Sequence, residues 1–153
     1  MLTIESIRNE FSFILAMIGE TETYFGTETF PGHGNFCEVY FNTLYKGLLQ
    51  EQVDIFNNFK RNYKKYLTEI EQQFSDSLSA FELSKLVDSR NSALLFDVIV
   101  ISQGHPKYDM ILVCGKRIKT FLFFKKNLDF RVEFKDGIII SAKRSKNTLV
   151  DND

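Results

Sequence analysis

A long helical periodicity is the feature that most constrains the fold of this chain. From Leu48 to Leu78 apolar residues recur in steps of three and four, and no Gly or Pro interrupts them. This spacing places the apolar residues on one side of an α-helix, and the opposite side holds charged residues such as Lys64 and Glu69. The sequence therefore predicts an amphipathic helix of about 30 residues that covers one side of a core. A break near Asn57–Asn58 or within Ser75–Ser79 stays open, because such a helix is longer than most.

Strand-like segments precede and follow this helix. Before it lie the apolar run at 11–18, the Thr-rich and aromatic segment at 21–30 and the alternating segment at 36–42; after it, past a short expected helix at 80–88, lie those at 94–102, 108–115, 120–126 and 129–144. In the last segment Asp136-Gly137 predicts a tight hairpin turn, since glycine tolerates the positive φ that such a turn needs.

Strands on both sides of one long helix predict a single α+β domain over residues 1–153. We expect a mainly antiparallel sheet packed on one face against the helix, with the runs at 94–101 and 110–114 as central strands. Sixteen Phe and no Trp predict a Phe-rich interior. We expect the termini, 1–9 and 145–153, to be frayed.

The chain contains two His and two Cys, which is a possible zinc-ligand set: His33, Cys37, His105 and Cys114. Structural zinc sites use closely spaced Cys pairs and His pairs, whereas both pairs here are mixed. Both Cys lie in apolar strand segments, where cysteine behaves as a small hydrophobe. We therefore predict buried thiols, no metal site and no catalytic residues. No phosphate-binding or other cofactor motif occurs, so no cofactor is expected.

Charge is distributed unevenly along the chain. Residues 1–44 hold six acidic and one basic residue, whereas residues 107–146 hold eleven basic and four acidic residues. We interpret the acidic part as a surface that binds another protein of opposite charge. The hypothetical contacts are Glu20, Glu22, Tyr24, Glu28 and Glu38.

Two alternatives remain open. Basic residues interleaved with Phe in the 116–126 region are typical of nucleic-acid-binding modules, and the candidates are Lys116, Arg117, Lys119, Lys125 and Lys126. Burial of the Phe rings and repulsion by the acidic part disfavour this function. The other alternative is a small enzyme centred on His33, for which no reaction class follows from the sequence.

The N-terminal apolar run does not predict a membrane segment. "FSFILAMIG" follows acidic residues where a signal peptide would be basic, and it is too short to span a bilayer. We expect a cytoplasmic protein with no membrane partner.

Three segments resemble small bacterial domains of uncharacterised function that include candidate immunity proteins of polymorphic toxin systems. They are the strand "FCEVYFN", the helix phrase "EQVDIFNNFKRNYKKYLTEI" and the hairpin "FRVEFKDGIII", which together cover most of residues 35–140. The resemblance implies a non-enzymatic protein that neutralises a toxin by occlusion, and it assigns no catalytic residue.

Overall fold

A computed structural model of the chain describes residues 16–18, 23–31, 36–42, 47–85, 94–102, 104–121 and 124–145. The periodic segment forms one helix, α2 (Gln50–Asp76), that is continuous through Asn57 and Asn58. It ends at Asp76, within the second of the two positions at which a break stays open, before α3 (Ala80–Lys85) begins. Its buried side chains follow the expected spacing of three and four: Gln52, Val53, Phe56, Phe59, Tyr63, Tyr66, Ile70 and Phe74.

Within the described residues, seven strands form one sheet whose spatial order is the order of the sequence. They are β1 (Ala16–Ile18), β2 (Thr23–Thr29), β3 (Phe36–Asn42), β4 (Leu95–Val100), β5 (Met110–Phe121), β6 (Phe124–Lys135) and β7 (Ile138–Arg144). All neighbouring strands are antiparallel except β3 and β4, which are parallel because α2 connects them across the sheet. The predicted α+β class and mainly antiparallel sheet are confirmed.

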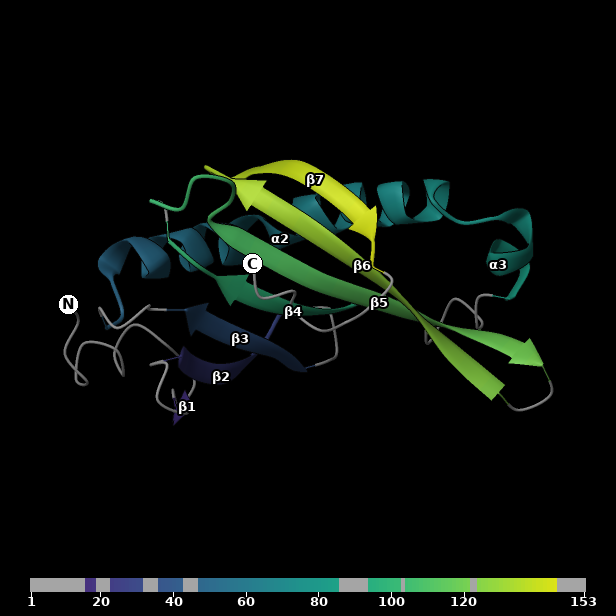
Figure 1. Cartoon of the computed structure of the whole chain (residues 1–153), viewed down its shortest axis with the longest axis horizontal. Coiled ribbons are helices and arrows are strands. Elements are labelled where there is room, and N and C mark those ends of the chain that lie inside the picture. The colour runs from purple at the N-terminus through teal and green to yellow at the C-terminus, as the bar shows by residue number, and fades with distance from the viewer. Residues whose placement is uncertain are drawn as a thin grey trace.

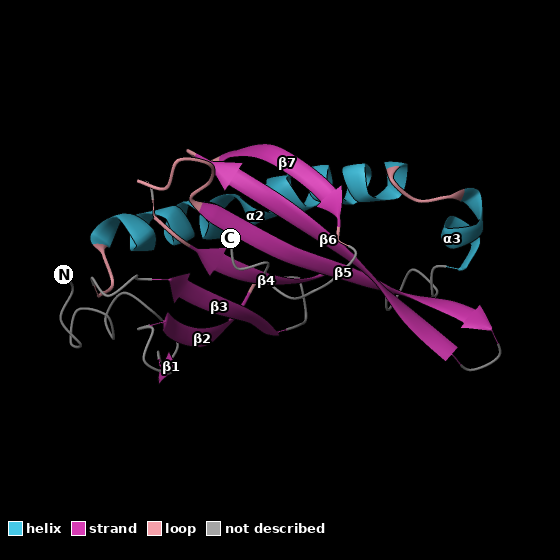
Figure 2. Ribbon diagram, in the orientation of Figure 1, coloured by secondary structure: helices cyan, strands magenta, loops and turns pink. Residues whose placement is uncertain are grey.

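Helix α2 lies along one face of the sheet (Figures 1 and 2). The alternating strands turn Val39, Val98 and Leu112 to this face, and each is fully buried. Phenylalanine rings fill the space between the two layers, and Phe59 contacts both Phe96 and Phe134 edge-on. Burial of each such ring contributes about 1.5–3 kcal/mol to folding, so this interior is the main source of stability.

The hairpin between β6 and β7 turns at the predicted residues. Lys135 pairs with Ile138, and the two residues between them, Asp136 and Gly137, have φ of 51° and 74°. Positive φ at both positions is the geometry of a two-residue turn that matches the twist of the flanking strands.

A second hairpin lies where the sequence predicted a single strand. The sequence predicts one strand over 120–126, but Phe121 pairs with Phe124, so the chain reverses between them. The two strands of this hairpin have 12 residues each. Their paired ends extend beyond the other strands of the sheet (Figure 1).

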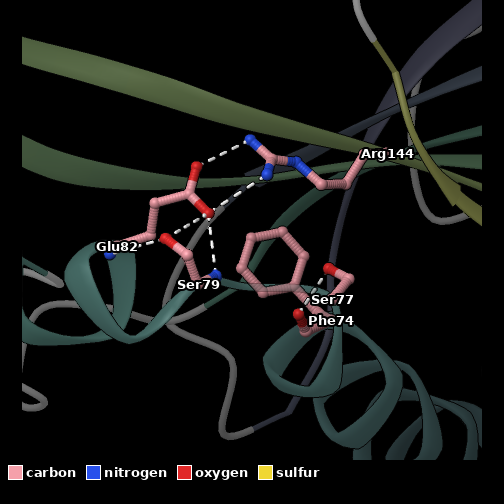
Figure 3. Close-up of polar contacts among 5 residues, drawn as sticks. All are labelled: Phe74, Ser77, Ser79, Glu82 and Arg144. Atoms are coloured by element: carbon pink, nitrogen blue, oxygen red, sulfur yellow. Dashed lines mark hydrogen bonds and ion pairs between the residues drawn. The ribbon is translucent and has the colours of Figure 1, made fainter.

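A short helix, α3 (Ala80–Lys85), follows α2 at the same end of the sheet. Ser79 caps it, since its hydroxyl accepts the Glu82 N–H while the Glu82 carboxylate accepts the Ser79 N–H. Arg144 of β7 donates two hydrogen bonds to the same carboxylate, at 2.9 and 3.1 Å (Figure 3). This ion pair attaches α3 to the sheet.

Candidate functional site

The face of the sheet opposite α2 is covered by no helix or strand among the described residues. Strand alternation places on it those residues of β3 to β6 that do not point toward α2. Two of them are large apolar side chains with high exposure: Phe36 is 78% exposed and Leu95 is 43% exposed. Exposed apolar side chains that lie together are typical of an interaction surface.

A hollow of about 450 Å³ opens beside these two side chains. Strands β3 to β6 all contribute to its lining, which consists of Phe36, Glu38, Leu95, Phe96, Asp97, Val113, Cys114, Gly115, Lys116 and Asp129. Gly115 allows the Asp129 carboxylate to approach the backbone closely, because a Cβ at this position would lie 3.2 Å from Oδ1 of Asp129. We refer to this feature as the acidic hollow, since its lining includes three carboxyl groups. Lys116 also lines it, but its amine lies toward Glu71 of α2.

Hydrogen bonds order one side of the acidic hollow. The backbone N–H of Glu38 donates to Oδ1 of Asp97 at 2.9 Å, and the Tyr40 hydroxyl donates to Oε2 of Glu38 at 2.6 Å. The pair Glu38 and Asp97 comes from the parallel strands β3 and β4, which are 59 residues apart in the sequence. The parallel register therefore creates this part of the site.

Two carboxyl groups of the acidic hollow, those of Asp97 and Asp129, are partly desolvated. Burial raises the pKa of Asp97; the N–H bond from Glu38 opposes this, and the nearby Glu38 carboxylate adds to it. Burial also raises the pKa of Asp129. Burial and the hydrogen bond to Glu38 raise the pKa of Tyr40 to about 12, so this hydroxyl stays protonated at neutral pH. A cation in the hollow would compensate for the solvation that the carboxylates lack.

The structure divides the predicted acidic contacts between the two faces of the sheet. Glu20 and Glu22 lie outside the described residues. Tyr24 packs against the core, and Glu28 is buried, with Oε2 2.6 Å from Nζ of Lys60 on α2. Only Glu38, among the predicted contacts that the structure describes, is on the open face. Tyr24 and Glu28 therefore do not share an exposed surface with Glu38, and neither belongs to the acidic surface on the open face.

The predicted basic residues all lie on the β5–β6 hairpin. Lys116 pairs with Leu128 at its base; its amine is 3.7 Å from Oε1 of Glu71 and lies over the Phe74 ring. Of the other four, Arg117 and Lys119 are on β5 and Lys125 and Lys126 are on β6. Lys119 is directly opposite Lys125 in the register, so the hairpin concentrates positive charge.

The predicted burial of the two thiols is confirmed. Cys37 and Cys114 are free and buried. Burial raises the pKa of Cys37 to about 12 and also raises that of Cys114, which is unfavourable for a thiolate nucleophile or metal ligand. His33 lies outside the described residues. His105 stacks on Tyr108, and among the described residues no three His, Cys, Asp or Glu are grouped closely enough to hold a metal ion.

Sequence reasoning missed four of the residues that shape the acidic hollow. The sequence pattern places Phe36 and Leu95 in strands but does not indicate that they are exposed, and Asp97 falls within an apolar run. Asp129 marks only the start of a strand in the sequence. A charged residue inside an otherwise apolar strand was the available indication for Asp97.

Comparisons of the chain with protein-family models, curated proteins and solved structures found no match. None of the helices in the described residues has both the length and the apolar character needed for a membrane span. The function must therefore be inferred from the geometry of the site.

Proposed function

We propose that this chain is a non-enzymatic protein-binding domain whose binding site is the acidic hollow. The observation that carries the proposal is the combination of an exposed aromatic ring, Phe36, with three carboxyl groups around a hollow of about 450 Å³. An aromatic anchor beside charged groups is typical of the few residues that contribute most of the binding energy in protein interfaces.

The chemistry of the hollow favours a partner with basic and apolar residues. An Arg or Lys side chain would face Glu38, Asp97 and Asp129, and an apolar side chain would pack on Phe36 and Leu95. Negative potential on one partner and positive potential on the other also accelerate association. A basic toxin is one such partner, and the domain would then act as an immunity protein that occludes the toxin.

The raised pKa values support binding more than chemistry. General acid–base catalysis needs a carboxyl group placed against a substrate in an enclosed site. The hollow is open, and the exposed Phe36 ring at its edge has no catalytic chemistry. A cation bound beside Asp97 and Asp129 would oppose the effect of burial on their pKa values, because it favours the ionised carboxylates.

Affinity capture from extracts of the native cell tests the proposal. The site variant is Phe36→Ser/Glu38→Gln. The matched control is Phe81→Ser/Glu69→Gln, which removes a 61% exposed Phe and one carboxylate from the helices. Proteins held by the wild type and the control but lost by the site variant are the expected result.

Calorimetry on the purified pair then gives the magnitude. Loss of an aromatic anchor weakens binding by about 2 kcal/mol or more, which is roughly 30-fold in Kd. The proposal fails if the site variant and the control capture the same proteins with the same affinity.

A further inference from the structure

The outer part of the β5–β6 hairpin has no neighbouring strand among the described residues. Strand β5 pairs with β4 as far as Gly115, and β6 begins to pair with β7 only at Phe130. The two strands nevertheless continue to pair from Lys116 and Leu128 to Phe121 and Phe124. We call this two-stranded part the ribbon. No described strand flanks it, and it extends past the sheet (Figure 1).

The sequence of the ribbon is complementary to the acidic hollow. From Lys116 to Leu128 there are five basic residues and no acidic residue. The register ends in the pair Phe121 and Phe124, so apolar residues occupy the far end. The acidic hollow offers three carboxyl groups beside the exposed Phe36. Lys116 belongs to both surfaces; beyond it the ribbon carries four basic residues, opposite in charge to the three carboxyl groups of the hollow, and both surfaces include apolar residues.

The two surfaces also adjoin each other on the same chain. Gly115 and Asp129 pair where the ribbon begins, and both line the acidic hollow. A two-fold axis near this pair would place the ribbon of each copy across the hollow of the other. Such an interface is self-complementary, and every ribbon–hollow contact occurs twice.

We propose that a second copy of this chain occupies the acidic hollow with its ribbon, forming a two-fold symmetric dimer. The inference rests on the proposed function, since it names a partner for the same binding face. A two-stranded ribbon is only marginally stable in water, so contact with a second copy would stabilise it.

Charge reversal on each surface tests the dimer. The ribbon variant is Lys125→Glu/Lys126→Glu, and the hollow variant is Glu38→Lys/Asp129→Lys. The control, Lys64→Glu/Lys65→Glu, makes the same charge change as the ribbon variant at exposed positions of α2. Sedimentation equilibrium measures the dimer Kd, and circular dichroism shows that each variant is folded.

We expect the wild type and the control to dimerise, more tightly at low salt than at high salt. Each variant alone should weaken dimerisation by on the order of 100-fold, because close charge pairs couple strongly in interfaces. An equimolar mixture of the two variants should form a heterodimer, since both of its ribbon–hollow contacts again join opposite charges. If the hollow variant does not fold, the dimer Kd of the ribbon variant and the salt dependence of the wild-type Kd still test the proposed dimer.

A wild type that stays monomeric at about 100 µM, a far weaker association than specific dimers show, overturns the inference. So does a mixture of folded variants that remains monomeric. Fluorescence anisotropy with a labelled oligonucleotide is measured in parallel: binding that the monomeric wild type shows and the ribbon variant loses would assign the ribbon to nucleic acid instead. A monomer that still captures a partner through Phe36 and Glu38 would overturn the dimer and leave the proposed function intact.

Discussion

Gln52 joins three parts of the fold through its side-chain amide. It lies in the first turn of α2 and is 1% exposed. Its Nε2 donates to the carbonyl oxygen of Asn42 at 2.8 Å and to that of Ile101, and its Oε1 accepts the N–H of Leu49 at 3.1 Å. These partners are at the end of β3, just after β4 and at the start of α2. The amide thus aligns the two parallel strands that create the acidic hollow.

Replacement of Gln52 by Leu removes three hydrogen bonds and leaves three backbone groups without their partner. Each buried unsatisfied group costs about 1–3 kcal/mol, and Asn42 is only half-buried, so water partly replaces its bond. Burial of the apolar Leu side chain offsets part of this cost, so we expect the free energy of unfolding to fall by about 3 kcal/mol. This is a large part of the stability of a domain of this size.

Replacement of Gln52 by Glu adds a dependence on pH. A carboxylate has no N–H for the two carbonyl oxygens and repels them, so the pKa of the introduced carboxyl group in the folded state should exceed its unfolded value of about 4.3. A raised folded pKa means that the folded state binds more protons, and stability is lost as the pH rises through this range. The loss relative to the wild type should therefore be larger at neutral than at acidic pH.

Urea denaturation followed by circular dichroism measures both effects. Gln72 provides the control, because it is exposed on the same helix and its amide donates only to Asp76, one turn away. Gln72→Leu and Gln72→Glu should each change stability by less than about 0.5 kcal/mol. A Gln52→Glu variant that matches the wild type at neutral pH would refute the role assigned to the amide.

Three further predictions concern the hollow, a turn and the thiols. Asp97→Asn should raise the thermal stability at neutral but not at acidic pH, because the raised pKa of Asp97 means that its ionisation destabilises the fold. Gly137→Ala should lower the free energy of unfolding by about 1–2 kcal/mol in urea titrations, since its φ of 74° is strained for Ala, whereas Gly104→Ala should have little effect. Cys37 and Cys114 should react with a thiol reagent, monitored by absorbance, only after unfolding, because both are buried.

Local patterns predicted the elements whose residues interact mainly with neighbours in sequence. Helix α2 follows from an apolar spacing that no Gly or Pro interrupts, and its end at Asp76 coincides with the cluster of serines after Phe74. Strand β3 has the predicted bounds, since its alternation is regular. The turn at Asp136 and Gly137 follows from the backbone freedom of one residue pair.

Features that depend on register could not be predicted in the same way. In β2, Glu28 resembles a solvated residue of a Thr-rich strand, but the pairing places it opposite Cys37, on the face that α2 covers. Asp97 meets Glu38 only because β3 and β4 are parallel, and no local pattern encodes that pairing. The segment 120–126 contains no Gly, Asn or Asp, so the reversal between Phe121 and Phe124 had no turn signature.

The two faces of the sheet differ in how closely they follow the rules of stable packing. The three buried polar residues of the described core all have partners: Glu28 pairs with Lys60, Gln52 with three backbone groups, and Asp109 with the N–H of Asp136. On the open face, by contrast, Asp97 has a raised pKa within a central strand, and Phe36 is left largely in water. Both features reduce stability, and both residues line the acidic hollow.

Residues that reduce stability in this way concentrate at functional sites, because a binding surface needs exposed apolar side chains and desolvated charges that selection for stability alone would remove. The same reasoning explains why the expected gain from Asp97→Asn should be accompanied by weaker binding of a basic partner.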